Sequence, residues 1–165
     1  MPPMGTNPQS IQEVAVFLPL LVGTLATVST IIIHGAAGRG MTLIVARVLH
    51  RDWTTASFVR DASIIAGAAM MLLSAHLLEI LVWAAVLTVC GEFHHFGLAC
   101  YHSAMNYSTL GYGDIVMSPR WRFMGPLEAL NGMLVVGLST AVLFAVVQQV
   151  ARRSLPQLSK DLFGA

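Results

Sequence analysis

The segment from Thr109 to Asp114 reads T-L-G-Y-G-D, and its chemistry would lie in its backbone. Two glycines flank a tyrosine, so alternate residues can adopt left-handed angles and successive carbonyl groups can point the same way. Four such segments around one axis would stack rings of carbonyl oxygens that replace the hydration shell of a K+ ion. The tyrosine side chain must then point outward, and carboxylates at the outer mouth would raise the local cation concentration. We therefore expect K+ coordination by Thr109, Leu110, Gly111, Tyr112 and Gly113, with Asp114 at the outer mouth.

This segment resembles the selectivity filter of the tetrameric potassium-channel pore-loop family, commonly T-V-G-Y-G-D. The similarity continues upstream as a pore-helix pattern and downstream as an inner-helix pattern. A glycine-rich turn that matches by accident is the alternative, but the segment lies between two apolar stretches of membrane length. The resemblance implies a small bacterial-type ion channel with an extra N-terminal helix, which conducts K+ passively. One chain supplies a quarter of such a filter, so a homotetramer is implied.

The composition is that of a membrane protein. The 165 residues are 56% hydrophobic and 10% charged, with a mean hydropathy of +0.72, which is too apolar for a soluble domain of this size. A net charge of +1 gives no reason to expect nucleic acid as a partner. Cys90 and Cys100 are too few for a disulfide framework. Since no nucleophile, phosphate loop or metal-ligand set is evident, we expect no enzyme and no cofactor, with K+ as the permeant ion.

We expect an all-α membrane protein with three transmembrane helices, a re-entrant pore helix and a filter loop. The chain would begin with an extracellular arm, and Ser10 to Glu13 reads as a helix-capping box. Pro19 predicts a kink in the first helix, and the stretch from Gly35 to Gly40 is expected to end it. The expected segments are the arm (1–13), a first transmembrane helix (14–34), a cytoplasmic linker with an amphipathic interfacial helix (35–60), a pore domain (61–150) and a cytoplasmic tail (151–165). Within the pore domain we expect an outer helix (61–90), a pore helix (98–107), the filter (109–114) and an inner helix (126–150).

Basic residues predict the orientation of the chain. The positive-inside rule places segments rich in Lys and Arg in the cytoplasm, so the N-terminus would be outside and the C-terminus cytoplasmic. We expect the plasma membrane, as in a bacterial inner membrane, with membrane lipid as a partner and a separate regulatory subunit as an open alternative for gating. Seven of the nine basic residues lie between the first two spans (Arg39, Arg47, Arg51, Arg60) or after the last (Arg152, Arg153, Lys160), and the other two, Arg120 and Arg122, fall in the outer linker.

Three ionisable residues of the pore domain are candidates for a role inside the membrane. His76 and Glu79 are three apart, so they share a helix face near mid-membrane, where an ionised carboxylate costs about 2.5–3.5 kcal/mol. The favoured interpretation is that both bond to polar groups of another helix, and a proton or metal sensor is the alternative. A metalloenzyme is disfavoured because only one His/Glu pair is evident and a site needs at least three ligands. Glu128 lies near the start of the inner helix, close to its positive dipole end.

The expected pore helix departs from the family that it resembles. Tyr101 and His102 stand where many relatives have two tryptophans, and Met105 stands where some have a glutamate behind the filter. Tyr101 or His102 is therefore expected to donate a hydrogen bond to Asp114. We expect four residues to support the filter: Tyr101, His102, Met105 and Ser108.

The inner helix carries the expected cavity and gating residues. Gly137 lies near the usual position of a gating glycine in the resembled family, although a close-packing role is equally consistent with the sequence. Ser139 and Thr140 are expected to line a cavity below the filter. His94 and His95 are interpreted as solvated residues of an outer turret, with pH or divalent-ion sensing as the alternative.

Two other functions stay open at this stage. A weakly selective cation channel would keep the same backbone with fewer ordered ion sites. A non-conducting membrane subunit or adaptor would keep the fold and act through a partner.

Overall fold

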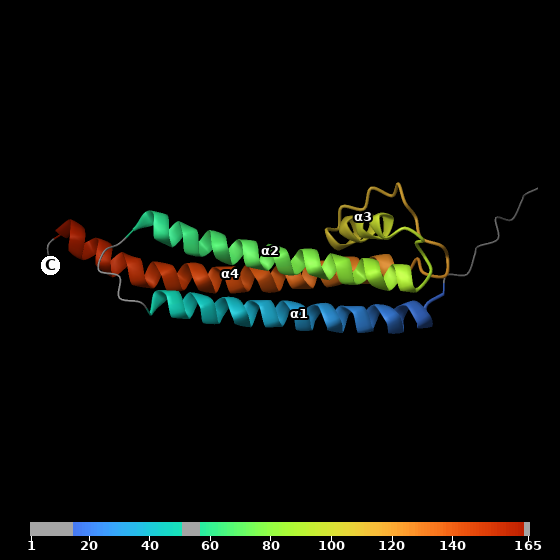
Figure 1. The fold of residues 1–165 in the computed structure, drawn as a ribbon, viewed down its shortest axis with the longest axis horizontal. Helices are drawn as coiled ribbons and strands as arrows, with labels where there is room; N and C mark the ends of the chain where they lie inside the picture. Colours follow the sequence, from blue (N-terminus) through green and yellow to red (C-terminus); the bar gives the residue numbers. More distant parts are fainter. Residues whose placement is uncertain (1–14, 51–56, 164–165) are drawn as a thin grey trace, which may run out of the picture.

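The computed structural model describes residues 15–50 and 57–163, with the helical backbone alone for 155–163. These residues form four helices and no strand: α1 (Phe17–Leu49), α2 (Phe58–Val89), α3 (Phe96–Tyr107) and α4 (Met124–Phe163). Figure 1 shows three long helices lying side by side, with the short α3 against one end of the bundle. Helices α1 and α2, and α4 over Met124–Ser154, are long and apolar enough to cross a membrane. The expected all-α fold with three spanning helices and one short helix is confirmed.

Helix α1 is longer than predicted. It begins at Phe17 and continues unbroken through the stretch from Gly35 to Gly40, where we expected the first span to end. The separate interfacial helix predicted within 35–60 is therefore wrong. The reason is packing: Gly38 is buried, and a Cβ atom at Gly40 would lie 3.2 Å from the Met71 side chain, so these glycines let α1 approach its neighbours. At about 1.5 Å per residue the helix measures about 50 Å, longer than a hydrocarbon core of about 30 Å.

One narrow face of α1 is buried against α2 and α4. Its residues recur at intervals of three and four, which places them in one stripe, and several are small. Pro19 belongs to this stripe and lies in the first turn, where its missing N–H removes no helical hydrogen bond. The physical cause of the predicted kink is therefore absent. The stripe consists of Pro19, Gly23, Ala26, Thr30, His34, Gly38, Met41 and Val45.

The other helices differ from prediction mainly at their ends. Helix α2 starts at Phe58 rather than 61, and α3 starts at Phe96 rather than 98. Helix α4 continues to Phe163, so most of the expected tail 151–165 is helical. The extension is held by a packed cluster at the end remote from α3 (Met41, Val45, Ala68, Leu72, Val146, Val150) and by the Ser154 hydroxyl, which donates to Asp61. The predicted arm 1–13 and capping box at Ser10 lie outside the described residues.

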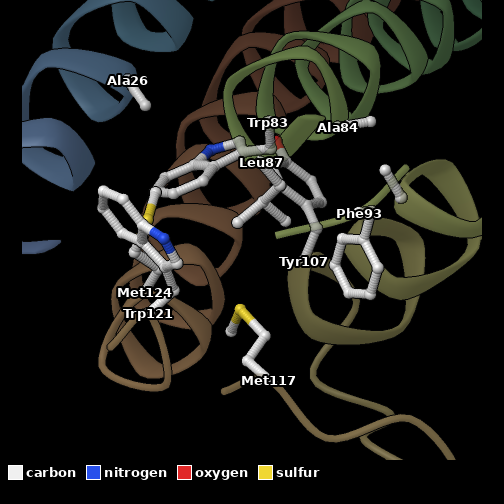
Figure 2. Close-up of a cluster of buried hydrophobic side chains, with 10 residues drawn as sticks. Ala26, Trp83, Ala84, Leu87, Phe93, Tyr107, Met117, Trp121 and Met124 are labelled. Carbon is white, nitrogen blue, oxygen red and sulfur yellow. The ribbon is translucent and has the colours of Figure 1, made fainter. Parts of the chain in front are cut away.

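A larger core lies at the α3 end of the bundle. Figure 2 shows Trp83 and Leu87 of α2 facing Tyr107 of α3, with Trp121 and Met124 beside them. The turret before α3 is tied to the segment after the filter, because the Glu92 carboxylate accepts bonds from the backbone N–H and hydroxyl of Ser118, each at 2.6 Å. This core fixes α3, and with it the residues that follow, against the spanning helices.

Candidate functional site

In the segment Thr109–Asp114, every second residue has a left-handed backbone conformation. Thr109, Gly111 and Gly113 have positive φ angles of 60°, 51° and 74°. The left-handed angles expected of the two glycines are present, and Thr109 extends the alternation by one step. A β-branched residue seldom occupies this region, so the surrounding structure must hold Thr109 there.

Helix α3 supplies that constraint through its last carbonyl groups. The Thr109 N–H donates to the Asn106 carbonyl at 2.8 Å, and the N–H groups of Leu110 and Gly111 both donate to the Met105 carbonyl at 3.0 and 3.1 Å. Met105 therefore supports the segment through its backbone. The Ser108 hydroxyl donates back to the Ala104 carbonyl at 2.6 Å, within α3 itself. The C-terminal turn of the helix and the start of the segment form one hydrogen-bonded unit.

Tyr101 forms a hydrogen bond with the Asp114 carboxylate. Its hydroxyl donates to Asp114 Oδ2 at 2.8 Å, and this bond raises the pKa of Tyr101, so the hydroxyl stays protonated and able to donate. His102, the other expected donor, turns away from Asp114. It accepts a bond from the Asn106 amide at 2.8 Å and packs against Phe93, with ring centroids 5.0 Å apart. Burial lowers the pKa of His102, which favours the neutral ring that this bond requires.

A second group of polar side chains is buried where all four helices meet. We call it the polar junction; it consists of His34 (α1), His76 and Glu79 (α2), Tyr107 (α3) and Ser139 (α4). His34 and Glu79 are fully buried, and His34 Nδ1 lies 2.9 Å from Glu79 Oε1. The Tyr107 hydroxyl donates to Glu79 Oε2 and lies 3.0 Å from His76 Nδ1. The Ser139 hydroxyl lies 2.7 Å from His76 Nε2 and 2.9 Å from His34 Nε2.

Each contact in the polar junction can take one hydrogen, and the contacts then close into a ring. His34 donates from Nε2 to the Ser139 hydroxyl, which donates to Nε2 of His76. His76 donates from Nδ1 to Tyr107, and Tyr107 donates to Glu79. The last contact, between Glu79 Oε1 and His34 Nδ1, closes the ring. Both oxygens of the buried Glu79 carboxylate thus have a partner, which lowers the cost of placing that side chain inside a membrane.

These contacts agree with the favoured interpretation of His76 and Glu79, that they bond to polar groups of other helices. Sequence reasoning missed His34, which it treated as the end of the first span. The available signal was one histidine in an otherwise apolar helical run. Ser139 was expected to line a cavity, but its hydroxyl instead turns toward the two imidazoles, because they offer it strong hydrogen bonds in an apolar region. The Thr140 hydroxyl donates to the Val136 carbonyl at 2.9 Å on an exposed part of α4.

The glycine that packs closely on α4 is Gly132 rather than Gly137. A Cβ atom at Gly132 would overlap the backbone carbonyl oxygen of Tyr107, so α4 and the end of α3 touch through backbone atoms. A Cβ atom at Gly137 would meet no atom within 4 Å among the residues that the structure describes. Close packing within the chain is therefore not the role of Gly137, and its gating role stays a prediction.

Two further buried polar residues of α4 lie near the polar junction. Glu128 is fully buried, and its carboxylate oxygens make no hydrogen bond with the described residues, although Ser103 and Asn106 face it. The Asn131 amide donates to the Thr30 hydroxyl at 2.9 Å, which ties α4 to α1. Buried polar side chains thus occur at Glu128 and Asn131 of α4 as well as in the polar junction.

Comparison with known proteins finds a family match for part of the chain. A family model described as an ion channel, Ion_trans_2, matches residues 75–149. The match covers the later part of α2, all of α3, the segment Thr109–Asp114 and most of α4, and it leaves α1 outside. No curated protein and no solved structure matches the chain.

Proposed function

Residues 75–149 are a domain of the Ion_trans_2 ion-channel family, and from this premise we propose that the protein conducts K+ selectively and passively across a membrane. The family is one of channels and not of enzymes. The proposal for K+ rests on the segment that follows α3, where the sequence T-L-G-Y-G-D coincides with left-handed angles at every second residue.

The physical link from these angles to K+ is the direction of the carbonyl groups. When every second residue has a left-handed conformation, successive carbonyl groups can point toward the same side of the chain. Several such chains around one axis form rings of oxygens that replace the hydration shell of a dehydrated cation. The proposed ligands are the backbone oxygens of Thr109, Leu110, Gly111, Tyr112 and Gly113, with Asp114 concentrating cations at the mouth. The bond from Tyr101 to Asp114 would keep that carboxylate in place.

Assembly as a homotetramer is part of the proposal. The side chains of Leu110 and Tyr112 are 55% and 70% exposed in a single chain, although the helix before them packs against α2 and α4. Apolar side chains of α4, among them Met133 and Leu134, are also exposed. Lipid or neighbouring chains must cover such surfaces, and four copies around an axis would cover those at the filter while completing the rings of carbonyl oxygens.

We also propose the orientation in the membrane. The start of α1 and the filter lie at the same end of the bundle in Figure 1, and the Ala15 N–H donates to the Pro119 carbonyl at 3.3 Å. Arg47, Arg60 and Arg152 lie toward the opposite end. The positive-inside rule then makes that end cytoplasmic and the filter mouth extracellular.

The test is the reversal potential of the purified protein in a planar bilayer, with K+ on one side and Na+ on the other. The expected result is reversal near the K+ equilibrium potential, abolished by Gly111→Ala, because alanine at a φ of 51° is strained. Gly91→Ala is the matched control: Gly91 also has a positive φ, of 76°, and lies in the turret. That variant should conduct with unchanged selectivity.

Other outcomes would overturn the proposal. Reversal near zero in the unmodified protein would identify a weakly selective cation channel. Silence across pH and voltage, together with co-purification of another subunit that restores current, would identify a non-conducting subunit. Equal loss of selectivity in both glycine variants would place the cause in folding and not in the filter.

A further inference from the structure

The polar junction brings three metal-ligating side chains together from two helices. His34, His76 and Glu79 each offer a ligand atom, and these atoms all lie within 4.8 Å of one another. The sequence presented a single His/Glu pair on α2, one ligand short of a metal site, and His34 on α1 supplies the third. We propose that His34, His76 and Glu79 bind a divalent transition metal ion of the zinc class.

The ligand atoms converge on one side of the two imidazole rings. Nδ1 of His34 lies 2.9 Å from one oxygen of Glu79, and Nδ1 of His76 lies 3.5 Å from the other. Ligands held at about 2.0–2.2 Å from a tetrahedral zinc ion lie roughly 3.3 Å from one another. The two nitrogen–oxygen separations lie on either side of this value, and the three ligand atoms lie within 4.8 Å of one another, so side-chain shifts would bring them to the spacing of a bound ion. The Tyr107 hydroxyl contacts two of the three proposed ligands, His76 and Glu79.

Ser139 orients the rings from the opposite side. Its hydroxyl lies within hydrogen-bond distance of Nε2 of both His34 and His76. Histidine ligands usually donate their second ring nitrogen to a fixed acceptor, and one hydroxyl oxygen has two lone pairs with which to accept both. Binding of the ion requires both Nδ1 atoms and the Glu79 carboxylate to be free of protons, with the single ring proton of each histidine on Nε2, where Ser139 accepts it in place of donating to His76. Coordination of the metal ion by His34, His76 and Glu79 would thus replace the hydrogen bonds that link these residues in the metal-free junction.

The donor set selects the class of ion. Two imidazole nitrogens and one carboxylate suit zinc and neighbouring transition metals, whereas Ca2+ and Mg2+ prefer sites made of oxygen alone. Such an ion would be distinct from the permeant K+, which the filter binds through backbone oxygens. Because His34 lies outside the family domain and the other two ligands lie inside it, the ion would fasten α1 to the channel domain.

The experiment measures zinc in the tag-free full chain, purified in detergent, incubated with zinc chloride and then dialysed. We expect about one zinc ion per chain in the unmodified protein. Glu79→Gln is the decisive variant, because its amide can donate to His34 and accept from Tyr107, so the hydrogen-bonded ring survives while the carboxylate ligand is lost. His94→Gln with His95→Gln is the control, since both turret histidines are exposed.

Glu79→Gln and His34→Gln should weaken zinc binding at least about ten-fold, and Ser139→Ala about 10–100-fold, the range found for outer partners of metal ligands. The turret double variant should bind zinc as the unmodified protein does. Equal zinc content in the unmodified protein and Glu79→Gln would overturn the proposal.

A second measurement uses only the unmodified protein, so it can be made even if His34→Gln fails to fold. X-ray absorption of zinc bound to the unmodified protein should show two imidazole ligands. A spectrum with one or none would place the zinc elsewhere and overturn the proposal, leaving the junction as a ring of hydrogen bonds.

Discussion

The filter segment and the polar junction are neighbours built in opposite ways. Tyr107 belongs to the junction, and the filter begins two residues later at Thr109. The proposed filter is one continuous segment with left-handed angles at every second residue, and its proposed chemistry lies in its backbone carbonyls. The junction is assembled from side chains on four helices, and its members His34 and Ser139 are more than a hundred positions apart in the chain. Local sequence can specify the first kind of site, but only the packed bundle can specify the second.

This difference predicts which changes each region tolerates. The junction should respond to the loss of hydrogen-bonding groups, because each member is satisfied by the others in an apolar setting. The filter should respond to changes of backbone freedom. The Tyr107 backbone carbonyl, which lies between the polar junction and the filter segment in the sequence, contacts α4 at Gly132.

The largest expected effect is that of Glu79→Leu. It removes the partner of His34 Nδ1 and one of the two partners of the Tyr107 hydroxyl, and breaking a buried hydrogen-bonded pair from one side costs about 3–5 kcal/mol of stability. Glu79→Gln, measured in the absence of metal, should cost no more than about 1 kcal/mol because the ring can still close. The measurement is the free energy of unfolding in mixed detergent, followed by circular dichroism. Equal losses for the two variants would show that the ring does not stabilise the bundle.

Gly132→Ala should lower stability by an intermediate amount, and it should affect both the polar junction and the filter segment. The added methyl group would overlap the Tyr107 carbonyl oxygen, and relieving that overlap costs about 1–3 kcal/mol. Since Tyr107 belongs to α3, whose last carbonyls hold the filter segment, ion selectivity should fall along with stability. The same unfolding assay and a K+/Na+ reversal potential report both effects.

The matched control for this prediction is Gly67→Ala on α2. A Cβ atom at Gly67 meets no atom within 4 Å among the described residues, and alanine favours a helix, so this variant should be neutral or slightly stabilising. If Gly132→Ala lowered stability and left selectivity unchanged, the contact with α4 would be structural only.

Acidification should produce the smallest effect. Burial lowers the pKa of His102 below its unfolded value of about 6.5, against the opposing influence of Glu92 and Asp114. The unfolded chain then binds more protons than the folded one, so this contribution to stability is complete above about pH 6.5 and is lost as pH falls through the folded pKa. The melting temperature of the purified protein should therefore decline below about pH 6.5, and His102→Gln should reduce that decline. An unchanged profile in His102→Gln would assign the decline to other groups.

The fold was predictable because its signals are local or compositional. Three apolar runs of membrane length, the T-L-G-Y-G-D segment and the tyrosine that bonds Asp114 could all be identified from the sequence. The course of α1 was not predictable, since a glycine-rich stretch reads as a helix end until its packing against Met71 is known. His34 and Gly132 were missed for a similar reason. Their roles depend on atoms contributed by other helices, which no periodicity within one segment can reveal.

The unbroken course of α1 has a mechanical consequence. The helix is about 50 Å long and has no break at which one half could move separately from the other. Its buried stripe runs from Pro19 to Val45, so α1 packs against its neighbours near both ends as well as through Thr30 and His34 in the middle. A displacement of α1 relative to the other helices would therefore involve the whole helix and, through the bond between Ala15 and Pro119, the segment that follows Asp114.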